Sequence, residues 1–474
     1  MTVWVGIDLG TQSVRVMAVT DTGDVVGSAS RPLTSRRDGD RHEQDPAEWW
    51  DALAAACSSA LHGVAQKDVG GVAVDATSGT VLLVDDAGNP RSPALMYDDR
   101  RAAGELARVN EVGGEVWARL GYRAMQPPWA LPKLLWLLRE HPEGTRLAHQ
   151  NDFVNRRLVG HETATDLSNA LKTGVDLIEE EWPFDVMAAL GVPASVLPRV
   201  VRPGSVLGTV CAAASEATGL PEGTPVIAGT TDGCAAQLGA GATAPGSWNS
   251  VLGTTLVLKG VTPDLVHDPL GVVYSHRAPD GGWLPGGASS TGAGVLARDL
   301  PGRDLDALAA EAESRTGLDA VTYPLVSPGE RFPFNAPDAR GFTLGTVDDD
   351  VSRYVAALRG AAFIERLCFD YLDLLGAPVD GEIILTGGAT RSGYWNRMRA
   401  DVLGRPVTLR ENAEPALGMA LLAQGLTARM ARTREVIEPR PADPALYLRF
   451  VDELAARGWL PGHVAAHAHE RSTR

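Results

Sequence analysis

The stretch from Val3 to Thr20, VWVGIDLGTQSVRVMAVT, contains two apolar runs separated by the polar turn LGTQS. Each run has the length and composition of a β-strand, and the Gly-Thr turn between them predicts a hairpin. A related pattern recurs at residues 248–262, WNSVLGTTLVLKGVT. Gly10 and Gly253 lie about half a chain length apart. The sequence therefore predicts two domains of similar topology.

The size and charge of the chain agree with two domains and exclude several classes of partner. At 474 residues it exceeds the range of about 250 to 300 residues in which a single hydrophobic core stops growing. Its 59 acidic and 43 basic residues give a net charge of −16, which disfavours binding to nucleic acid or to anionic membranes. The start MTVWVGIDLG lacks the basic region of a signal peptide, and the cysteines are scattered. We expect a cytoplasmic protein without nucleic-acid or membrane partners.

Helix and strand signals extend the two-domain prediction along the chain. Asp45 and Pro46 favour a helix start, and the segment from Val351 to Ala377 has the apolar spacing of a long helix. The run GAGATAPGS near residues 239–247 resembles a linker. We expect an N-terminal domain at 1–242, a C-terminal domain at 243–442, and a helix with a frayed tail at 443–474.

Two carboxylates occupy positions suited to phosphate chemistry. Asp8 ends an apolar strand just before a Gly-Thr turn, an arrangement that suits Mg²⁺ and the oxygens of a polyphosphate. The alternative is a plain hairpin with polar turn residues, but the second Gly-Thr hairpin favours phosphate binding. Asp232 opens an Ala-rich helix after the strand-like segment PVIAGTT. It is either a helix N-cap or a general base beside a cleft.

Several segments occur in an order typical of one enzyme family. They include GIDLGTQSVRVMAV, DATSGTVLLVDD, TDLSNALKTGVD, AGTTDGCAA, SVLGTTLVL, ILTGGATRSGYWNRMRA and EPALGMALLA. Together the chain resembles the FGGY carbohydrate kinase family over most of residues 3–424. The resemblance implies an α/β fold of two actin-like (ribonuclease H-like) domains, as in the hexokinase, actin and heat-shock ATPase superfamily. It also implies a deep interdomain cleft, with sugar bound mainly by the N-terminal domain and ATP mainly by the C-terminal domain.

The resemblance also implies roles for individual residues. Asp232 corresponds to the catalytic base, and Asp8 to the second catalytic carboxylate and the ligand of Mg²⁺. The residues implied in binding ATP are Gly10, Thr11, Gly253, Thr254, Thr255, Gly292, Gly388, Ala389, Ser392 and Trp395. Core packing is the alternative for Trp395. The residues implied in binding the sugar are Thr77, Ser78, Asp99 and Asp232. Ser78 and Asp99 could instead be turn residues, since both types favour turns.

The expected substrate follows from the segment around Ser78. Relatives that phosphorylate xylulose usually carry Met-His-Gly there, whereas this chain has Thr77-Ser78-Gly79, which resembles ribulose-type kinases. We therefore expect ATP-dependent phosphorylation of D-ribulose at C5. D-xylulose or another polyol is the alternative substrate, because Tyr97 stands where many members have Trp.

Other functions stay open at this stage. A non-enzymatic actin-like ATP-binding protein would share the hairpins without sugar chemistry. GAGATA and GAGVLA fit the loose dinucleotide pattern of a dehydrogenase, but neither lies in a strand-helix-strand unit with a later acidic residue. His463, His467 and His469 have metal-like spacing, although a solvated tail is the expected context. A homodimer is left open.

Overall fold

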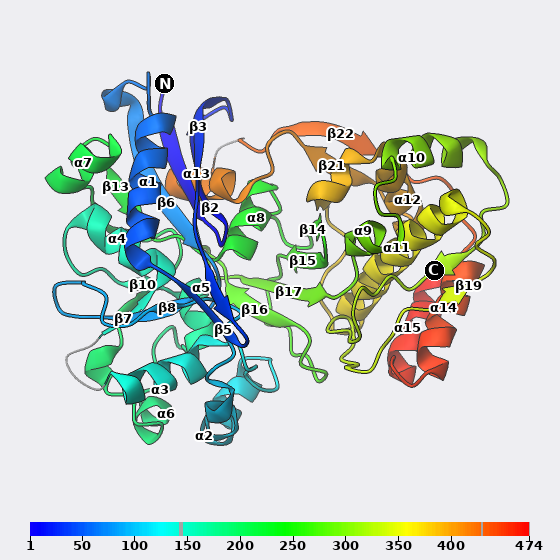
Figure 1. Cartoon of the computed structure of the whole chain (residues 1–474), viewed down its shortest axis with the longest axis horizontal. Coiled ribbons are helices and arrows are strands. Elements are labelled where there is room, and N and C mark those ends of the chain that lie inside the picture. Colours follow the sequence, from blue (N-terminus) through cyan, green and yellow to red (C-terminus); the bar gives the residue numbers. More distant parts are fainter. Residues whose placement is uncertain (142–145, 428–429, 474) are drawn as a thin grey trace. The chain divides into compact units, whose positions relative to one another are not determined.

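The computed structural model describes residues 1–141, 146–427 and 430–473 and contains two compact units (Figure 1). Unit 1 comprises Met1–Gly241, His276–Trp283 and Asn412–Arg432. Unit 2 comprises Ala242–Ser275, Leu284–Glu411 and Thr433–Arg474. Each unit is therefore discontinuous in sequence.

A six-stranded sheet with the order β12-β13-β6-β1-β2-β3 forms the centre of unit 1. Its strands are β1 (Val3–Leu9), β2 (Ser13–Thr20), β3 (Val25–Pro32), β6 (Val69–Ala76), β12 (Val206–Thr209) and β13 (Pro225–Ile227). The first three strands form the predicted antiparallel hairpins, whereas β6 pairs in parallel with both β1 and β13. Side chains of β1 are buried along nearly the whole strand, as expected where both faces of a sheet are covered.

Helices cover both faces of this sheet. Helix α1 (Pro46–Ala60) contacts β2 and β3, and its N-cap Asp45 accepts a hydrogen bond from the Ala47 N–H. On the other face, α13 (Pro415–Gln424) packs against β1 and β6. Residue 6 must be glycine, because a Cβ there would lie 1.7 Å from the Ala416 carbonyl oxygen. The sequence prediction placed α13 in the C-terminal domain, whereas this close packing joins it to unit 1.

The sheet of unit 2 resembles that of unit 1 in how most of its strands pair. It has seven strands in the order β16-β17-β15-β14-β20-β21-β22. The strands are β14 (Trp248–Leu252), β15 (Leu256–Gly260), β16 (Tyr274–Arg277), β17 (Trp283–Ser289), β20 (Ile383–Thr386), β21 (Val407–Arg410) and β22 (Thr433–Ile437). As in unit 1, three antiparallel strands (β17, β15 and β14) adjoin two parallel strands (β20 and β21) and an antiparallel edge strand (β22). The sheet differs from that of unit 1 in two ways: β16 adds a strand beside β17, and β22 follows β21 along the chain, whereas β12 precedes β13. The predicted repeat is thus present in the topology, and the fold is the expected two-domain α/β architecture.

The long helix of unit 2 is α11 (Asp350–Leu374), which is buried along most of its length. Asp349 caps it by accepting a hydrogen bond from the Ser352 N–H. The C-terminal segment does not fray as expected, because it forms α14 (Ala445–Ala456) and α15 (Gly462–Ser472). Phe450 and Val464 of these helices are buried in the same core as α11.

The remaining elements complete the two units. A further sheet, with the order β4-β5-β8-β7-β9, contains β4 (Arg36–Asp38), β5 (Arg41–Gln44), β7 (Val81–Val84), β8 (Ala94–Leu95) and β9 (Arg146–His149). Two short strand pairs are β10 (Thr165–Asp166) with β11 (Val200–Val201) and β18 (Val321–Thr322) with β19 (Thr343–Leu344). The other α-helices are α2 (Leu106–Arg119), α3 (Ala130–Glu140), α4 (Gln150–Val159), α5 (Leu167–Ala170), α6 (Phe184–Ala189), α7 (Ala212–Thr218), α8 (Asp232–Gly239), α9 (Gly294–Asp299), α10 (Leu305–Ser314) and α12 (Gly393–Leu403). Among the described residues, no helix is both long and apolar enough to cross a membrane.

Candidate functional site

Three carboxylates gather at the carboxyl ends of the parallel strands of unit 1. Asp8 on β1 stands in register with Asp75 on β6. Asp232 is the first residue of α8 and follows Thr231, which forms a β-bridge with Ala76 directly after Asp75. The carboxyl ends of parallel strands are the usual ligand-binding edge of an α/β sheet. The structure therefore brings the two predicted catalytic carboxylates together and adds Asp75, which the sequence analysis did not single out.

The proximity of these acids changes their protonation. Burial and the negative charge of Asp232 raise the pKa of Asp8 to about 6, although Arg15 opposes that change. Burial and the charges of Asp8 and Asp232 raise the pKa of Asp75 well above its usual range. Like charges in a buried site favour either a shared proton or a bound cation. The cluster therefore has the electrostatic character of a cation or proton site.

A magnesium ion fits this cluster chemically. Both carboxylate oxygens of Asp75 are buried and lack a hydrogen-bond donor within the described part of the chain. No group of three or more Asp, Glu, His or Cys side chains among the described residues is already arranged to hold a metal. Magnesium bound with a nucleotide commonly uses only one or two carboxylates, because phosphates and water supply its other ligands. Asp8 and Asp75 meet that requirement.

The turn after β6 carries the predicted sugar ligands Thr77 and Ser78. The Thr77 N–H and hydroxyl both donate to Gln150 Oε1, at 3.1 and 2.6 Å. In contrast, the buried Ser78 hydroxyl has no hydrogen-bond partner among residues 1–141, 146–427 and 430–473. A buried hydroxyl without a partner is costly, and a polar ligand would satisfy it. Ser78 thus has the character of a sugar ligand, whereas Thr77 holds the turn.

Asp99 lies in a different environment from Ser78. It is fully buried, and its oxygens accept hydrogen bonds from the His42 N–H at 2.7 Å and from Arg101. The guanidinium of Arg101 reaches both oxygens of Asp99, with a shortest distance of 2.8 Å. The structure shows Asp99 fixing Arg101 and the chain near His42. A direct contact of Asp99 with sugar stays a prediction.

The first Gly-Thr turn joins β1 and β2 beside Asp8. The Gly10 N–H donates to the Ser13 carbonyl oxygen at 3.1 Å, and the Thr11 carbonyl accepts from Gln44 Nε2 at 2.6 Å. Arg15, two residues into β2, is in register with Asp8. The turn therefore places Gly10, Thr11 and a cation beside the carboxylate cluster. No sequence motif around Arg15 marks it as a site residue. Only the strand pairing that sets it opposite Asp8 identifies it.

The second Gly-Thr turn lies between β14 and β15 in unit 2. It contacts the loop of Gly292, where a Cβ would lie 2.4 Å from the Thr254 carbonyl oxygen. The Ala293 N–H donates to the Gly253 carbonyl at 2.8 Å. Gly387, at the end of β20, approaches the same turn, since its Cβ would lie 2.6 Å from the Leu252 carbonyl oxygen. Gly253, Thr254, Thr255, Gly292 and the Gly387-Gly388 segment are thus brought together. A Cβ at Gly292 or Gly387 would clash with the turn, whereas Gly253 and Gly388 have open space where a Cβ would lie.

Two neighbouring aromatic residues at the start of α12, Tyr394 and Trp395, have side chains that point in different directions. Ser392 caps the helix by accepting from the Trp395 N–H at 3.2 Å, and Ala389 lies in the preceding 3₁₀ turn, Gly388–Arg391. Trp395 is only 3% exposed, and its indole N–H donates to the Leu358 carbonyl in the core. Of the two alternatives for Trp395, the structure therefore shows core packing. Helical phase points Tyr394 the other way.

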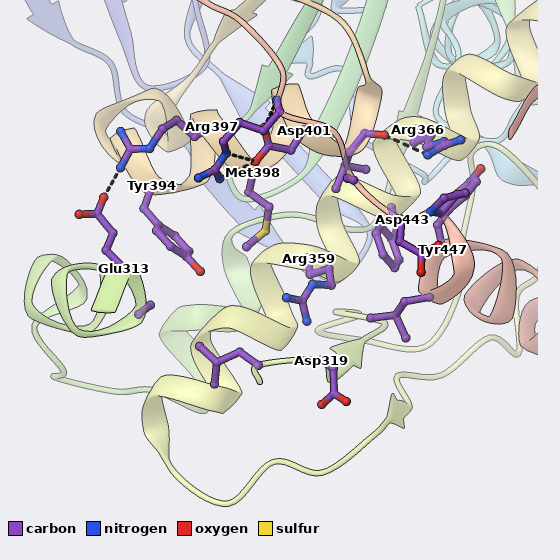
Figure 2. Close-up of a pocket in the computed structure, with 18 of the residues that line it drawn as sticks. Glu313, Asp319, Arg359, Arg366, Tyr394, Arg397, Met398, Asp401, Asp443 and Tyr447 are labelled. Carbon is purple, nitrogen blue, oxygen red and sulfur yellow. Dashed lines mark hydrogen bonds and ion pairs between the residues drawn. The ribbon is translucent and has the colours of Figure 1, made fainter. Parts of the chain in front are cut away.

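Tyr394 lines a pocket of about 720 Å³ in unit 2. Figure 2 shows Tyr394 and Arg397 of α12 around this pocket, with Arg359 of α11 and Tyr447 of α14. Tyr394 also stacks on Tyr354, with ring centroids 6.5 Å apart. The pocket combines aromatic surface with guanidinium groups and acidic side chains, and two of its arginines, Arg397 and Arg440, pair with Glu313 and Asp401. Its residue Tyr394 lies two positions after the predicted nucleotide residue Ser392.

The C-terminal histidines do not gather into a metal site. His467 Nε2 contacts Asp373 at 2.8 Å, and His469 Nε2 contacts Asp452 at 2.7 Å. These pairs join α15 to α11 and to α14, respectively. The expected solvated tail is instead a packed helix with acidic partners, which the sequence could not show because the partners lie 94 and 17 residues away.

Comparisons with known proteins cover both units. Residues 3–239 match the N-terminal domain of the FGGY family of carbohydrate kinases, and residues 248–424 match its C-terminal domain. The chain is 33% identical over 439 residues to a xylulose kinase of Streptomyces coelicolor, covering 89% of this chain and 87% of that protein. It is 34% identical over 442 residues to the xylulose kinase of Streptomyces rubiginosus, covering 89% and 87%.

Solved structures give the same result for the fold. The crystal structure of xylulose kinase from Rhodospirillum rubrum superposes with a TM-score of 0.86 and 29% identity, covering 96% of this chain and 99% of that one. Glycerol kinase of Plasmodium falciparum with ADP reaches a TM-score of 0.85 at 18% identity, covering 97% and 99%, and supports the fold alone. With the ordered motifs and the carboxylate cluster, these matches identify the chain as a sugar kinase. It belongs to the FGGY family of carbohydrate kinases.

Proposed function

We propose that the chain transfers the γ-phosphate of ATP to the C5 hydroxyl of D-xylulose. The observation that carries the proposal is the cluster of Asp8, Asp75 and Asp232 at one sheet edge. The relatives at 33% and 34% identity are named xylulose kinase. They support D-xylulose over the D-ribulose that the Thr77-Ser78 segment suggested.

Asp232 is the proposed general base. Its Oδ1 accepts a hydrogen bond from the Gly233 N–H at 2.7 Å, which orients the carboxylate at the start of α8. During transfer, the acceptor hydroxyl gives its proton to Asp232 while its oxygen attacks the γ-phosphorus, and the bond from that phosphorus to the bridging oxygen of the β-phosphate breaks to release ADP. A positioned carboxylate of this kind contributes about 10² to 10⁴ in rate. The Ser78 hydroxyl donates to or accepts from a sugar hydroxyl and fixes the acceptor.

The proposed phosphate site uses few charged side chains. Asp8 and Asp75 would hold Mg²⁺, which when bound neutralises charge on the phosphates. Arg15 adds a positive charge beside this site. The backbone turn of Gly10 and Thr11 can be approached by phosphate oxygens. In unit 2, Gly253, Thr254 and Thr255 form the second proposed phosphate-binding turn.

The nucleoside end of ATP is assigned to the region around α12. Gly292, Gly388, Ala389 and Ser392 line the approach to the nucleoside, and Tyr394 rather than Trp395 offers an aromatic face. We assign the aromatic contact to Tyr394 because Trp395 is buried, whereas Tyr394 lines the pocket shown in Figure 2.

D-ribulose is the second candidate acceptor. The favouring observation is the buried hydroxyl of Ser78, which has no hydrogen-bond partner in the described part of the chain and occupies the place where xylulose-type relatives usually have His. The two ketopentoses differ only in configuration at C3, so one changed polar contact can decide between them. A lost hydrogen bond to a buried group changes affinity by about 1–3 kcal/mol.

A sugar panel tests the proposal. ADP release is measured with a coupled assay in the presence of D-xylulose, D-ribulose, glycerol and gluconate. We expect D-xylulose to give the largest kcat/KM and D-ribulose the next. ADP release stimulated only by glycerol or gluconate would contradict a ketopentose kinase, and a larger kcat/KM for D-ribulose would select the second candidate.

A further inference from the structure

The Ser78–Gly79 turn is held in place by two lysines. Lys172, in the 3₁₀ turn Leu171–Thr173, donates from Nζ to the Ser78 carbonyl oxygen at 3.1 Å. Lys133 of α3 is fully buried and donates to the Gly79 carbonyl at 2.6 Å and to the Met96 carbonyl at 2.8 Å. Both carbonyls of the turn therefore accept from an ammonium group.

The backbone of this turn leaves little room for another arrangement. Gly79 has φ +95°, in the left-handed region that favours glycine. A Cβ at this position would lie 3.1 Å from Lys172 Cδ. The Lys172 side chain thus packs along the turn, and its contact with Ser78 O fixes the peptide that carries the unpartnered Ser78 hydroxyl.

Lysine is rare in this chain, and half of its lysines contact the Ser78–Gly79 turn. Only four of the 43 basic residues are lysines, and two of the four hold this turn. An ammonium is a compact donor on a thin stem, whereas a guanidinium is a broad planar fork suited to carboxylates and phosphates. Two neighbouring carbonyls in a buried turn match the smaller group.

The surroundings of Lys172 couple it to the carboxylate cluster. Burial lowers its pKa to about 8, against the opposing effect of the negative charge of Asp232; Cys234, on the same helix α8, is the other titratable group that acts on Lys172. Lys133 on α3 also faces it: burial lowers the pKa of Lys133 to about 7, and the positive charge of Lys172 acts in the same direction. Lys172 therefore contacts the turn that carries Ser78 and interacts electrostatically with the proposed base.

We infer that Lys172 is a positioning residue for the acceptor sugar: its ammonium holds the Ser78 peptide and places a positive charge beside Asp232. This inference rests on the proposed function of the same site. It assigns the protonated side chain a role in sugar binding rather than in the handling of ATP. Because lysine loses its proton as pH rises, acceptor binding weakens at alkaline pH.

The test compares Lys172→Met and Lys172→Arg with the matched control Lys67→Met, whose side chain is exposed. For each protein, kcat and the KM values for D-xylulose and ATP are measured from pH 6.5 to 9.5. We expect Lys172→Met to raise the acceptor KM by about tenfold or more, the size of one charge-assisted hydrogen bond. The KM for ATP should stay within about twofold, and Lys67→Met should match the wild type.

The pH profile distinguishes positioning from a general loss of structure. In the wild-type enzyme the acceptor KM should rise as pH passes about 8. In Lys172→Met this rise should vanish, and Lys172→Arg should restore part of the affinity without a rise below pH 9.5. An unchanged acceptor KM in Lys172→Met, or equal rises in both KM values, would overturn the inference.

The wild-type enzyme alone gives a second test in case the variants do not fold. A flat acceptor KM between pH 7 and 9 contradicts the role of Lys172 even without a variant. Failure of the proposed function has a different signature, because then no ketopentose stimulates ADP release from the wild-type enzyme. If another sugar proves to be the acceptor, the same comparison is made with that sugar.

Discussion

At the scale of single residues, buried acids should make stability depend on pH. Asp166 accepts hydrogen bonds from the Asn169 N–H at 2.8 Å and from Asn151 Nδ2 at 2.7 Å, yet burial raises its pKa to about 6. An unfolded aspartate has a pKa near 3.9. The stability that Asp166 contributes is therefore present below about pH 4 and is lost as pH rises through about 6.

Replacing Asp166 with Asn should flatten this dependence. Between pH 5 and pH 8, the wild-type free energy of unfolding should fall relative to that of Asp166→Asn by about 1.4 kcal/mol, since about one unit of the shift is titrated in this range. The measurement is urea unfolding at both pH values, with the exposed change Asp86→Asn as control. A wild-type stability that rises relative to Asp166→Asn over this range would show that the carboxylate is stabilised as the anion.

Sequence alone identified some site residues and missed others for a clear reason. Asp8 precedes a Gly-Thr turn, and Asp232 stands where a strand is followed by a helix. Both signals can be read from neighbouring residues in the sequence. Asp75 lies inside an apolar strand, and only its pairing with Asp8 across the sheet gives it significance. The family resemblance implied that Trp395 binds ATP, but the phase of α12 turns it into the core and turns Tyr394 outward.

At the scale of elements, α13 is the piece that the sequence could not place. Its segment follows unit 2 strands along the chain, but Gly6 allows it to pack directly on β1. Close approach of a helix backbone to a strand leaves no local signature in either segment. The hairpins, by contrast, were predicted from short-range alternation and turn residues, and they form as expected.

The contact of β1 with α13 gives an element-scale prediction. Gly6→Ala puts a Cβ 1.7 Å from the Ala416 carbonyl oxygen, so either the helix or the strand must move. We expect unit 1 to lose about 2–4 kcal/mol of stability, as overpacked core sites do. Gly104→Ala is the control, since its Cβ would meet nothing within 4 Å. Equal thermal midpoints for Gly6→Ala and Gly104→Ala would show that α13 does not pack closely on β1.

At the scale of the whole molecule, the two units share a similar pattern of strand pairing but differ in their chemical content. Unit 1 carries the acidic cluster and the Ser78 turn, whereas unit 2 carries the glycine-rich loops around Thr254 and Gly387. The half-chain repeat of Gly-Thr turns was enough to predict this duplication. The acceptor sugar was not predictable in the same way, because it depends on a few polar contacts in one turn.

The central claim is that Asp232 serves as the base of a ketopentose kinase. The most direct measurement is kcat for D-xylulose in wild type and Asp232→Asn, with thermal unfolding to verify the fold. We predict a kcat lower by about 10² to 10⁴, the range for loss of a general base, with an unchanged melting temperature. A folded Asp232→Asn enzyme that keeps kcat within twofold of wild type would contradict the account and leave Asp232 a structural residue at the start of α8.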